Sequence, residues 1–340
     1  MLPIFDGHND LLTCDDYAGF ATARPEGDVD LPRMAEGGMR GGIFAVYTPS
    51  AEAERTGVPR EDGVLEFALD VEVERPRAAA MATVAAGRLF AFERAGLVKV
   101  ARSITDIDAA REGDGPPVAV LHLEGAEPID TALESLETWY AAGLRSLGPV
   151  WSRSNRFGHG VPFIFPSSPD TGPGLTEFGH ALVRRCAELG IALDLSHITE
   201  QGFWDVARAE LGPLIVSHAG AHRLSPCSRN LTDAQIDAVG ASDGLIGVVF
   251  GTAFVRADFE RDPDTPLAVI AEHARYVADR IGVSHVALGS DFDGTTIPQA
   301  LGGAAGLPKL LDALREVGFD EAELQLITWD NWRRVLNAWW

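Results

Sequence analysis

Eight short apolar runs, spaced along the whole chain, constrain its fold more than any other feature. They occupy residues 2–5, 42–47, 118–123, 144–150, 191–195, 214–217, 245–250 and 286–289. Each is only about four to seven residues long and rich in Val, Ile, Leu or Ala, which is typical of parallel strands buried on both faces. The runs therefore predict a parallel sheet with eight strands.

Amphipathic patterns fill most of the intervals between these runs. Helices are expected at residues 130–142, 179–189, 232–239, 265–281 and 306–317, the third of them capped by Thr232. Eight strands that alternate with helices predict an α/β fold, a single (β/α)8 TIM barrel over residues 1–340. An open, doubly wound sheet would show the same pattern, but no GxGxxG motif opens the first strand-to-helix turn.

Three segments depart from the simple alternation. Residues 50–95 are expected to form a helical insertion, with one extended helix over residues 61–88 that is interrupted near Pro76. Residues 151–174 are rich in Gly, Pro and Ser and predict a long loop over the mouth of the barrel. Residues 321–340 predict an amphipathic helix whose final Trp339 and Trp340 pack on the barrel or on a partner subunit.

Charge and composition limit the partners. The chain has 28 basic and 50 acidic residues, a formal net charge of −22, and such a surface repels nucleic acid and anionic membranes. No apolar run reaches the roughly 18 residues of a membrane span, and the N-terminus lacks the features of a signal peptide. Cys14, Cys186 and Cys227 show no paired spacing, as expected in a reducing compartment. We therefore expect a cytoplasmic protein with no nucleic-acid or membrane partner.

Polar residues follow five of the eight runs, at the strand ends where a barrel carries its active site. After the first run come His8 and Asp10, whose spacing places both side chains on one face of an extended strand. One imidazole and one carboxylate can bind the same divalent ion. Taken alone, such a pair is more often a turn histidine with a capping aspartate.

Glu124 follows the third run directly. An ionised carboxylate there is costly unless it is paired or bound to metal, and its two oxygens can bridge two cations. Alternation places His122 on the same face, where it could support the ligands from behind. Neither Lys99 nor Lys309, the only lysines, ends a predicted strand, so a carboxylated lysine cannot be the bridge.

The fifth and sixth runs both lead into a Ser-His pair, Ser196-His197 and Ser217-His218. Two histidines at equivalent positions on neighbouring strands, together with the preceding ligands, predict a metal site. The eighth run leads into Asp291, which is placed to act as a general base on metal-bound water. Asp293 is expected to be a turn residue before Gly294.

With these residues in hand, the chain resembles the membrane (renal) dipeptidase family, the M19 metallopeptidases within the amidohydrolase-like barrels. The matching stretches span nearly the whole chain: DGHND at 6–10, HLEGAEPI at 122–129, DLSH at 194–197, SHAGAH at 217–222, CSRNLTD at 227–233 and GSDFDG at 289–294. The resemblance implies two divalent ions and a homodimer. Zinc is the expected metal, although manganese, iron or cobalt would suit the same ligands.

The resemblance also implies roles for individual residues. His8 and Asp10 would hold one ion, His197 and His218 the other, and Glu124 would bridge both. Asp291 matches the family's catalytic aspartate. Arg229 matches the arginine that binds the C-terminal carboxylate of the substrate, a pairing for which a guanidinium is well shaped.

One position departs from the family pattern. Members of the mammalian type carry a substrate-contacting histidine at the end of the fourth strand, where this chain has Trp151. Trp supplies no acid–base group. His159, on the adjacent loop, is a candidate to enter the site in its place.

The expected function is hydrolysis of the peptide bond of dipeptides, including L-Xaa-D-Xaa, by a metal-bridging hydroxide. Trp151 keeps open a second hydrolase function, on another amide or ester such as an N-acyl amino acid or a lactone. A non-catalytic metal-binding relative is the third alternative, and the complete ligand set with Asp291 argues against it.

Overall fold

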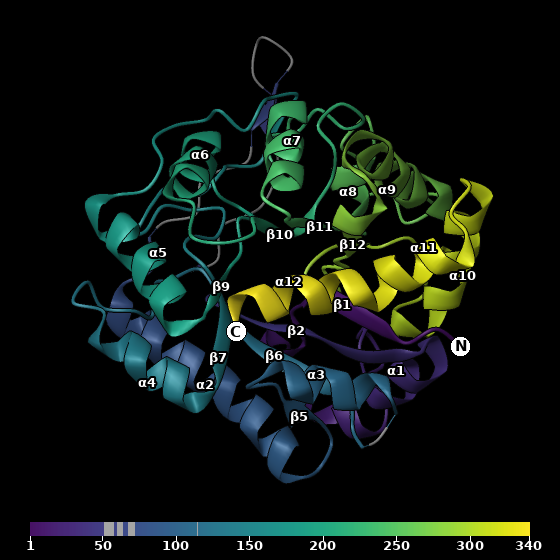
Figure 1. Cartoon of the computed structure of the whole chain (residues 1–340), viewed down its shortest axis with the longest axis horizontal. Coiled ribbons are helices and arrows are strands. Elements are labelled where there is room, and N and C mark those ends of the chain that lie inside the picture. Colours follow the sequence, from purple (N-terminus) through teal and green to yellow (C-terminus); the bar gives the residue numbers. More distant parts are fainter. Residues whose placement is uncertain (51–57, 60–63, 67–71, 114) are drawn as a thin grey trace.

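The eight predicted strands form the centre of the molecule (Figure 1). The computed structural model describes residues 1–50, 58–59, 64–66, 72–113 and 115–340. One parallel path joins β1 (Ile4–Asn9), β2 (Met39–Tyr47), β6 (Val118–Glu124), β7 (Leu144–Gly148) and β9 (Ala192–Leu193), with β5 (Lys99–Val100) beside β6. A second parallel sheet joins β10 (Ile215–Ala219), β11 (Leu245–Val248) and β12 (Val286–Leu288). All eight apolar runs are therefore strands.

Isolated parallel bridges connect the edges of the two sheets. Asp194, just beyond β9, pairs with Ile215 of β10, and Asn9 of β1 pairs with Phe292, just beyond β12. The amide of Asp10 donates to the carbonyl of Phe292 at 2.9 Å, and the amide of Asp291 donates to the carbonyl of His8 at 3.1 Å. The ends of the first and last strands therefore meet.

Burial explains why these runs form strands. Every residue of β6 is buried, including His122 and Glu124, and the same holds for β1, β10, β11 and β12. A strand with both faces covered reads as a continuous apolar run. The helices lie around the strands (Figure 1) and supply that cover.

The α-helices follow the predicted pattern with shifted ends. Their bounds are α1 (Leu31–Gly37), α2 (Arg75–Arg94), α3 (Ile104–Arg111), α4 (Glu134–Ala142), α5 (Glu177–Leu189), α6 (Glu200–Ala209), α7 (Asp233–Ala241), α8 (Thr252–Val255), α9 (Leu267–Ile281), α10 (Leu307–Glu316), α11 (Glu321–Gln325) and α12 (Asn331–Trp339). Thr232 caps α7 as expected, since its hydroxyl accepts from the amide of Gln235. The helix expected from residue 130 begins later, because the Asp130 carboxylate accepts the amides of Glu134 and Ser135.

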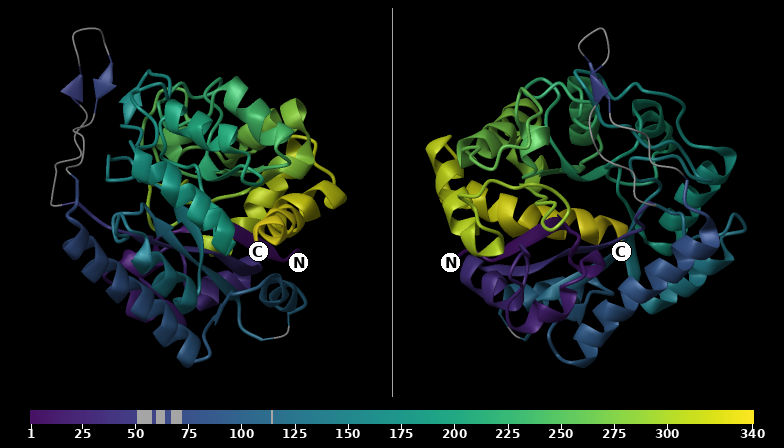
Figure 2. Two further views of the ribbon diagram at one scale, coloured as in Figure 1. Left: turned by 60° about the vertical axis from the view of Figure 1, so that its left-hand side comes forward. Right: turned by 180° about the vertical axis from the view of Figure 1, so that it is seen from behind.

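The long helix expected over residues 61–88 is wrong in its bounds. Leu65–Glu66 is strand β4, which pairs antiparallel with β3 (Val58–Pro59) and β8 (Ile164–Phe165), and Figure 2 shows β3 and β4 at the edge of the molecule. Pro76 does not interrupt a helix but lies in the first turn of α2, where its missing N–H breaks no helical bond. Residues 61–63 and 67–71 of that predicted helix lie outside the described residues.

The C-terminal segment covers the end of the strands opposite their carboxyl ends. The single helix expected there is divided into α11, a π-helical turn (Leu326–Asp330) and α12. Trp332 donates its indole N–H to the carbonyl of Leu288 at 3.0 Å, and its ring lies 5.8 Å from Phe5. Trp339 and Trp340 donate to the carbonyls of Pro213 and Arg145 of the same chain.

The inner side chains of the strands form one apolar layer with α12. Its members from the strands are Phe5, Ile43, Val118, Val120, Ala192, Ile215, Leu245 and Ala287. These residues lie in the first parts or the middle of their strands, so the polar residues at the strand ends gather on the far side of this layer. Within the described chain, no helix has the length and apolar composition that a membrane crossing requires.

Candidate metal centre

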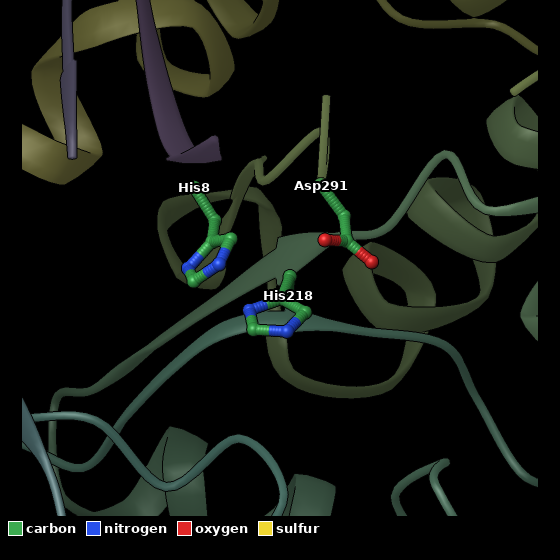
Figure 3. A group of neighbouring side chains, drawn as sticks. All are labelled: His8, His218 and Asp291. Atoms are coloured by element: carbon green, nitrogen blue, oxygen red, sulfur yellow. The ribbon is translucent and has the colours of Figure 1, made fainter. Parts of the chain in front are cut away.

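Six of the sequence-predicted residues meet at the carboxyl ends of the strands. Glu124 is the last residue of β6, and His8 and His218 are the last but one of β1 and β10. The others follow the ends of their strands: Asp10 after β1, His197 after β9 and Asp291 after β12. All six are buried. Candidate ligand atoms within 4.8 Å of one another occur in the groups His8–Asp10–Glu124, Glu124–His197–His218 and His8–His218–Asp291. Figure 3 shows the last of these groups converging from three separate segments.

Glu124 lies at the centre of the cluster. Its Oε1 is 3.0 Å from Nε2 of His197, 3.5 Å from Nε2 of His8 and 3.7 Å from Nε2 of His218. The Nε2 atoms of His197 and His218 are themselves 2.9 Å apart. One carboxylate therefore faces three imidazole nitrogens that come from three different strand ends.

Several buried polar atoms of this cluster lack a hydrogen-bond partner among the described residues. Both ring nitrogens of His8 and Oδ1 of Asp10 make no hydrogen bond there. Buried polar atoms are costly when they are unpaired, and a divalent cation would satisfy them. Imidazole nitrogens and carboxylate oxygens are the donors that zinc and neighbouring transition metals take in proteins. These residues therefore fit a metal centre.

The charges favour a cation at the same place. Although burial lowers the pKa of His8, the carboxylates of Glu124, Asp10 and Asp291 raise it to about 10. Among the protein groups alone, burial raises the pKa of Asp291 to about 7, and Glu124 adds to this rise. A bound dication would oppose both effects, because it supplies the positive charge that the three carboxylates attract.

Backbone strain accompanies the cluster. His197 and Asp291 have φ angles of 66° and 58°, in the left-handed region that side chains seldom occupy. Each such residue costs on the order of 1–3 kcal/mol, and such strain gathers at functional sites. Gly294 is required beside them, since a Cβ there would lie 2.1 Å from Oδ2 of Asp10 and 2.5 Å from Oδ1 of Asp291.

Of the three residues expected to contact the substrate, Arg229 and Trp151 lie beside His197, whereas His159 does not. Arg229 is buried, and its Nη2 is 3.2 Å from Nε2 of His197 and 3.2 Å from the carbonyl of His218. The ring of Trp151 lies 5.6 Å from that of His197. His159 instead pairs its Nδ1 with the carbonyl of Gly174 at 2.9 Å, and the described residues that line the cavity do not include it.

A cavity of about 480 Å³ opens above the cluster. Asp10, Glu124, His197 and Asp291 line its floor. Sequence reasoning missed most of the aromatic part of its wall, which consists of Tyr47, Trp151, Phe163 and Phe254 and lies beside polar residues such as Thr13, Arg261 and Thr295. The ring of Trp151 is 4.9 Å from Tyr47 and 5.7 Å from Phe163, so it forms part of a continuous aromatic surface. No sequence signal marks the other three aromatic residues, because they come from three unrelated segments: the end of β2, the loop before β8 and α8.

The loop at residues 151–174 lies against the segment that carries His197. The amide of Val161 donates to the carbonyl of His197 at 2.7 Å, and Gly160 forms a bridge with Ile198. The Ser152 hydroxyl lies 2.7 Å from Nδ1 of His197. The predicted loop therefore holds one of the clustered histidines.

Asp293 lies in the turn expected for it and is held by a buried ion pair. Arg24, 1% exposed, donates to the Asp293 carboxylate and to the carbonyl of Val29. The other carboxylate oxygen of Asp293 accepts the amide of Asp28. Nothing in the sequence indicates this pair, because Arg24 and Asp293 are 269 residues apart.

The variant Arg24→Met is expected to lower the free energy of unfolding by about 3–5 kcal/mol, because it leaves the buried Asp293 carboxylate uncompensated. Urea denaturation measures this loss. Arg315→Met is the matched control, since its pairs with Asp312 and Glu321 are exposed and contribute little. Equal losses in the two variants would contradict a stabilising role for the buried pair.

Comparison with known proteins places this geometry in a family. The model of the membrane dipeptidase family (peptidase family M19) matches residues 1–339. A metallopeptidase structure from Rhodobacter sphaeroides, liganded with a phosphinate mimic of the dipeptide L-Ala-D-Ala, is 41% identical with a TM-score of 0.95, over 100% of this chain and 99% of that one.

Curated relatives are similar over most of the chain as well, and two of them illustrate the range. A Klebsiella pneumoniae protein, described as the uncharacterized protein in the pqqA 5′ region, is 48% identical over 72% of this chain and 90% of its own length. The dipeptidase aclJ of Aspergillus oryzae is 28% identical over 99% of this chain and 78% of its own. The chain therefore belongs to the membrane dipeptidase family, peptidase family M19, and is a metallopeptidase of that family.

Proposed function

We propose that this protein is a dinuclear zinc dipeptidase that hydrolyses dipeptides, including those of L-Xaa-D-Xaa configuration. The observation that carries the proposal is the position of Glu124, whose Oε1 faces the Nε2 atoms of His8, His197 and His218 within 3.7 Å. His8 and Asp10 would hold one ion, His197 and His218 the other, and Glu124 both. The dipeptide mimic in the related Rhodobacter sphaeroides structure supports the substrate class.

The metal pair would supply Lewis-acid activation of water and of the scissile carbonyl. Asp291 lies on the cavity floor with its carboxylate beside His8 and His218, where it can accept a proton and pass it to the leaving amine. Arg229, whose Nη2 lies 3.2 Å from Nε2 of His197, would bind the C-terminal carboxylate of the substrate. The aromatic residues of the wall offer apolar contact to substrate side chains, and the volume of about 480 Å³ suits a short peptide.

We also propose that the eight strands close into one (β/α)8 barrel that forms a single domain. The two isolated bridges, Asp194–Ile215 and Asn9–Phe292, support closure because they join the sheets at both of their edges. The apolar layer of inner side chains supports it as well, since seven of the eight main parallel strands, all except β7, contribute to it. A homodimer and a cytoplasmic location stay predictions.

Turnover of a dipeptide library by the zinc-loaded protein tests the function. We expect hydrolysis of L-Xaa-L-Xaa or L-Xaa-D-Xaa dipeptides and little hydrolysis of N-acetylated or C-amidated analogues, because Arg229 and the acidic floor recognise the two free ends. The same plate should include N-acyl amino acids and lactones, the alternative substrates that Trp151 keeps open. Faster turnover of those compounds than of any dipeptide, with zinc bound, would contradict the proposal.

A further inference from the structure

We propose that Asp194 and Ser217 are positioning residues that hold His218 in the tautomer needed for metal binding. The proposal rests on the proposed metal centre. It assigns a role to the first residue of each of the two motifs that carry the histidines, Asp194 of DLSH and Ser217 of SHAGAH.

A chain of hydrogen bonds runs from Asp194 to the imidazole of His218. The Ser217 hydroxyl lies 2.6 Å from Oδ2 of Asp194 and 2.8 Å from Nδ1 of His218. Ser217 and His218 are 0% exposed and Asp194 is 2% exposed. Solvent therefore cannot replace any member of the chain.

Asp194 is held as an acceptor. Its Oδ1 accepts the amides of Ser217 at 2.8 Å and Ser196 at 3.1 Å, and the hydroxyl of Ser196 at 2.9 Å. A carboxyl group surrounded by donors has no acceptor for a proton of its own. It is therefore ionised and takes the hydroxyl proton of Ser217.

Proton counting then fixes the tautomer. A serine hydroxyl has one proton to donate, and Asp194 receives it. The contact between Ser217 and Nδ1 of His218 must then use a lone pair of Ser217, so Nδ1 carries the proton. The Nε2 atom is left with its lone pair, and it faces Glu124 at 3.7 Å and Nε2 of His197 at 2.9 Å. This is the atom that would bind the metal.

His122 offers a natural comparison. Its Nδ1 lies 2.9 Å from the Ser146 hydroxyl, nearly the same distance as the 2.8 Å between Ser217 and Nδ1 of His218. His122 lies behind the cluster and is not among the proposed metal ligands. The Nε2 of His122 lies 3.7 Å from Oδ2 of Asp194, and its ring lies 5.7 Å from that of His8. Removing the Ser146 hydroxyl therefore costs one buried hydrogen bond at a histidine that borders the cluster but is not itself a proposed ligand.

Zinc affinity of Ser217→Ala, with Ser146→Ala as the matched control, tests the proposal. Each purified protein is stripped of metal and titrated with zinc against a chromophoric chelator. We expect Ser217→Ala and Asp194→Asn to bind one of two zinc ions about 10- to 100-fold more weakly, and Ser146→Ala to change little. Unchanged affinity of Ser217→Ala for both ions, with a native circular dichroism spectrum, would overturn the proposal.

The tautomer is measured directly by NMR of the histidine side-chain nitrogens in the zinc-loaded wild type. We expect a slowly exchanging proton on Nδ1 of His218, and its faster exchange in Ser217→Ala. Absence of that proton in the wild type would overturn the proposal even if the variants failed to fold. Neither readout uses turnover, so the proposed dipeptidase activity can fail while the positioning role stands.

Discussion

The variant Asp291→Asn is expected to reduce kcat for dipeptide hydrolysis about 100- to 10,000-fold, which is the usual contribution of a positioned general acid–base group. The Asp291 carboxylate lies on the cavity floor and groups with His8 and His218 within 4.8 Å. Asparagine has nearly the same shape but cannot accept the proton. It also tolerates the φ angle of 58° at this position better than other residues do, so the turn is expected to persist.

The control for this variant is its metal content. Elemental analysis should find the same zinc stoichiometry as in the wild type, because the proposed ligands are unchanged. A variant that retains zinc and full turnover would remove Asp291 from the mechanism. A variant that loses zinc would instead assign Asp291 to the metal ligands.

The variant Glu124→Ala is expected to abolish the stabilisation of the protein by zinc. A ligand that binds only the folded state stabilises it by about 2.7 kcal/mol when its free concentration is roughly 100-fold above the dissociation constant. Glu124 faces three imidazole nitrogens, so its removal would take a ligand from both proposed ions. Thermal unfolding with and without zinc measures the effect.

For each protein, the melting temperature with zinc is compared with that after chelator treatment. The difference reports metal binding separately from any loss of stability that the substitution itself causes. The wild type should melt at a higher temperature with zinc than after treatment with a chelator, whereas the Glu124→Ala variant should melt at the same temperature in both. A zinc-dependent rise of wild-type size in the variant would contradict a central role for Glu124. Ser146→Ala should show the full wild-type rise.

The positions of the strands and of the candidate ligands could be predicted because both depend on local patterns. A strand buried on both faces must be apolar, so the eight runs were visible directly. Because parallel strands end at the same edge, side chains that follow them must meet there, and His8, Glu124 and His218 do.

Other features could not be predicted because their partners are distant along the chain. Nothing near Arg24 indicates that it pairs with Asp293, and nothing near Phe163 or Phe254 indicates that they line the same cavity as Trp151. The helix expected over residues 61–88 failed because helical composition does not show where the chain turns. There Pro76 marked the start of α2 and not a break.

The sequence by itself determined the eight strands, the order of the polar residues that follow them and the family to which they belong. The tertiary structure decided which side of the Glu124 carboxylate faces the imidazoles, that His159 turns to Gly174 while Trp151 borders the cavity, and that Ser217 links Asp194 to His218. The physical reason is the separation along the chain over which each kind of interaction acts. Burial and periodicity act on neighbouring residues, whereas hydrogen bonds and ring contacts need atoms within a few ångströms, and only the folded chain brings those atoms together.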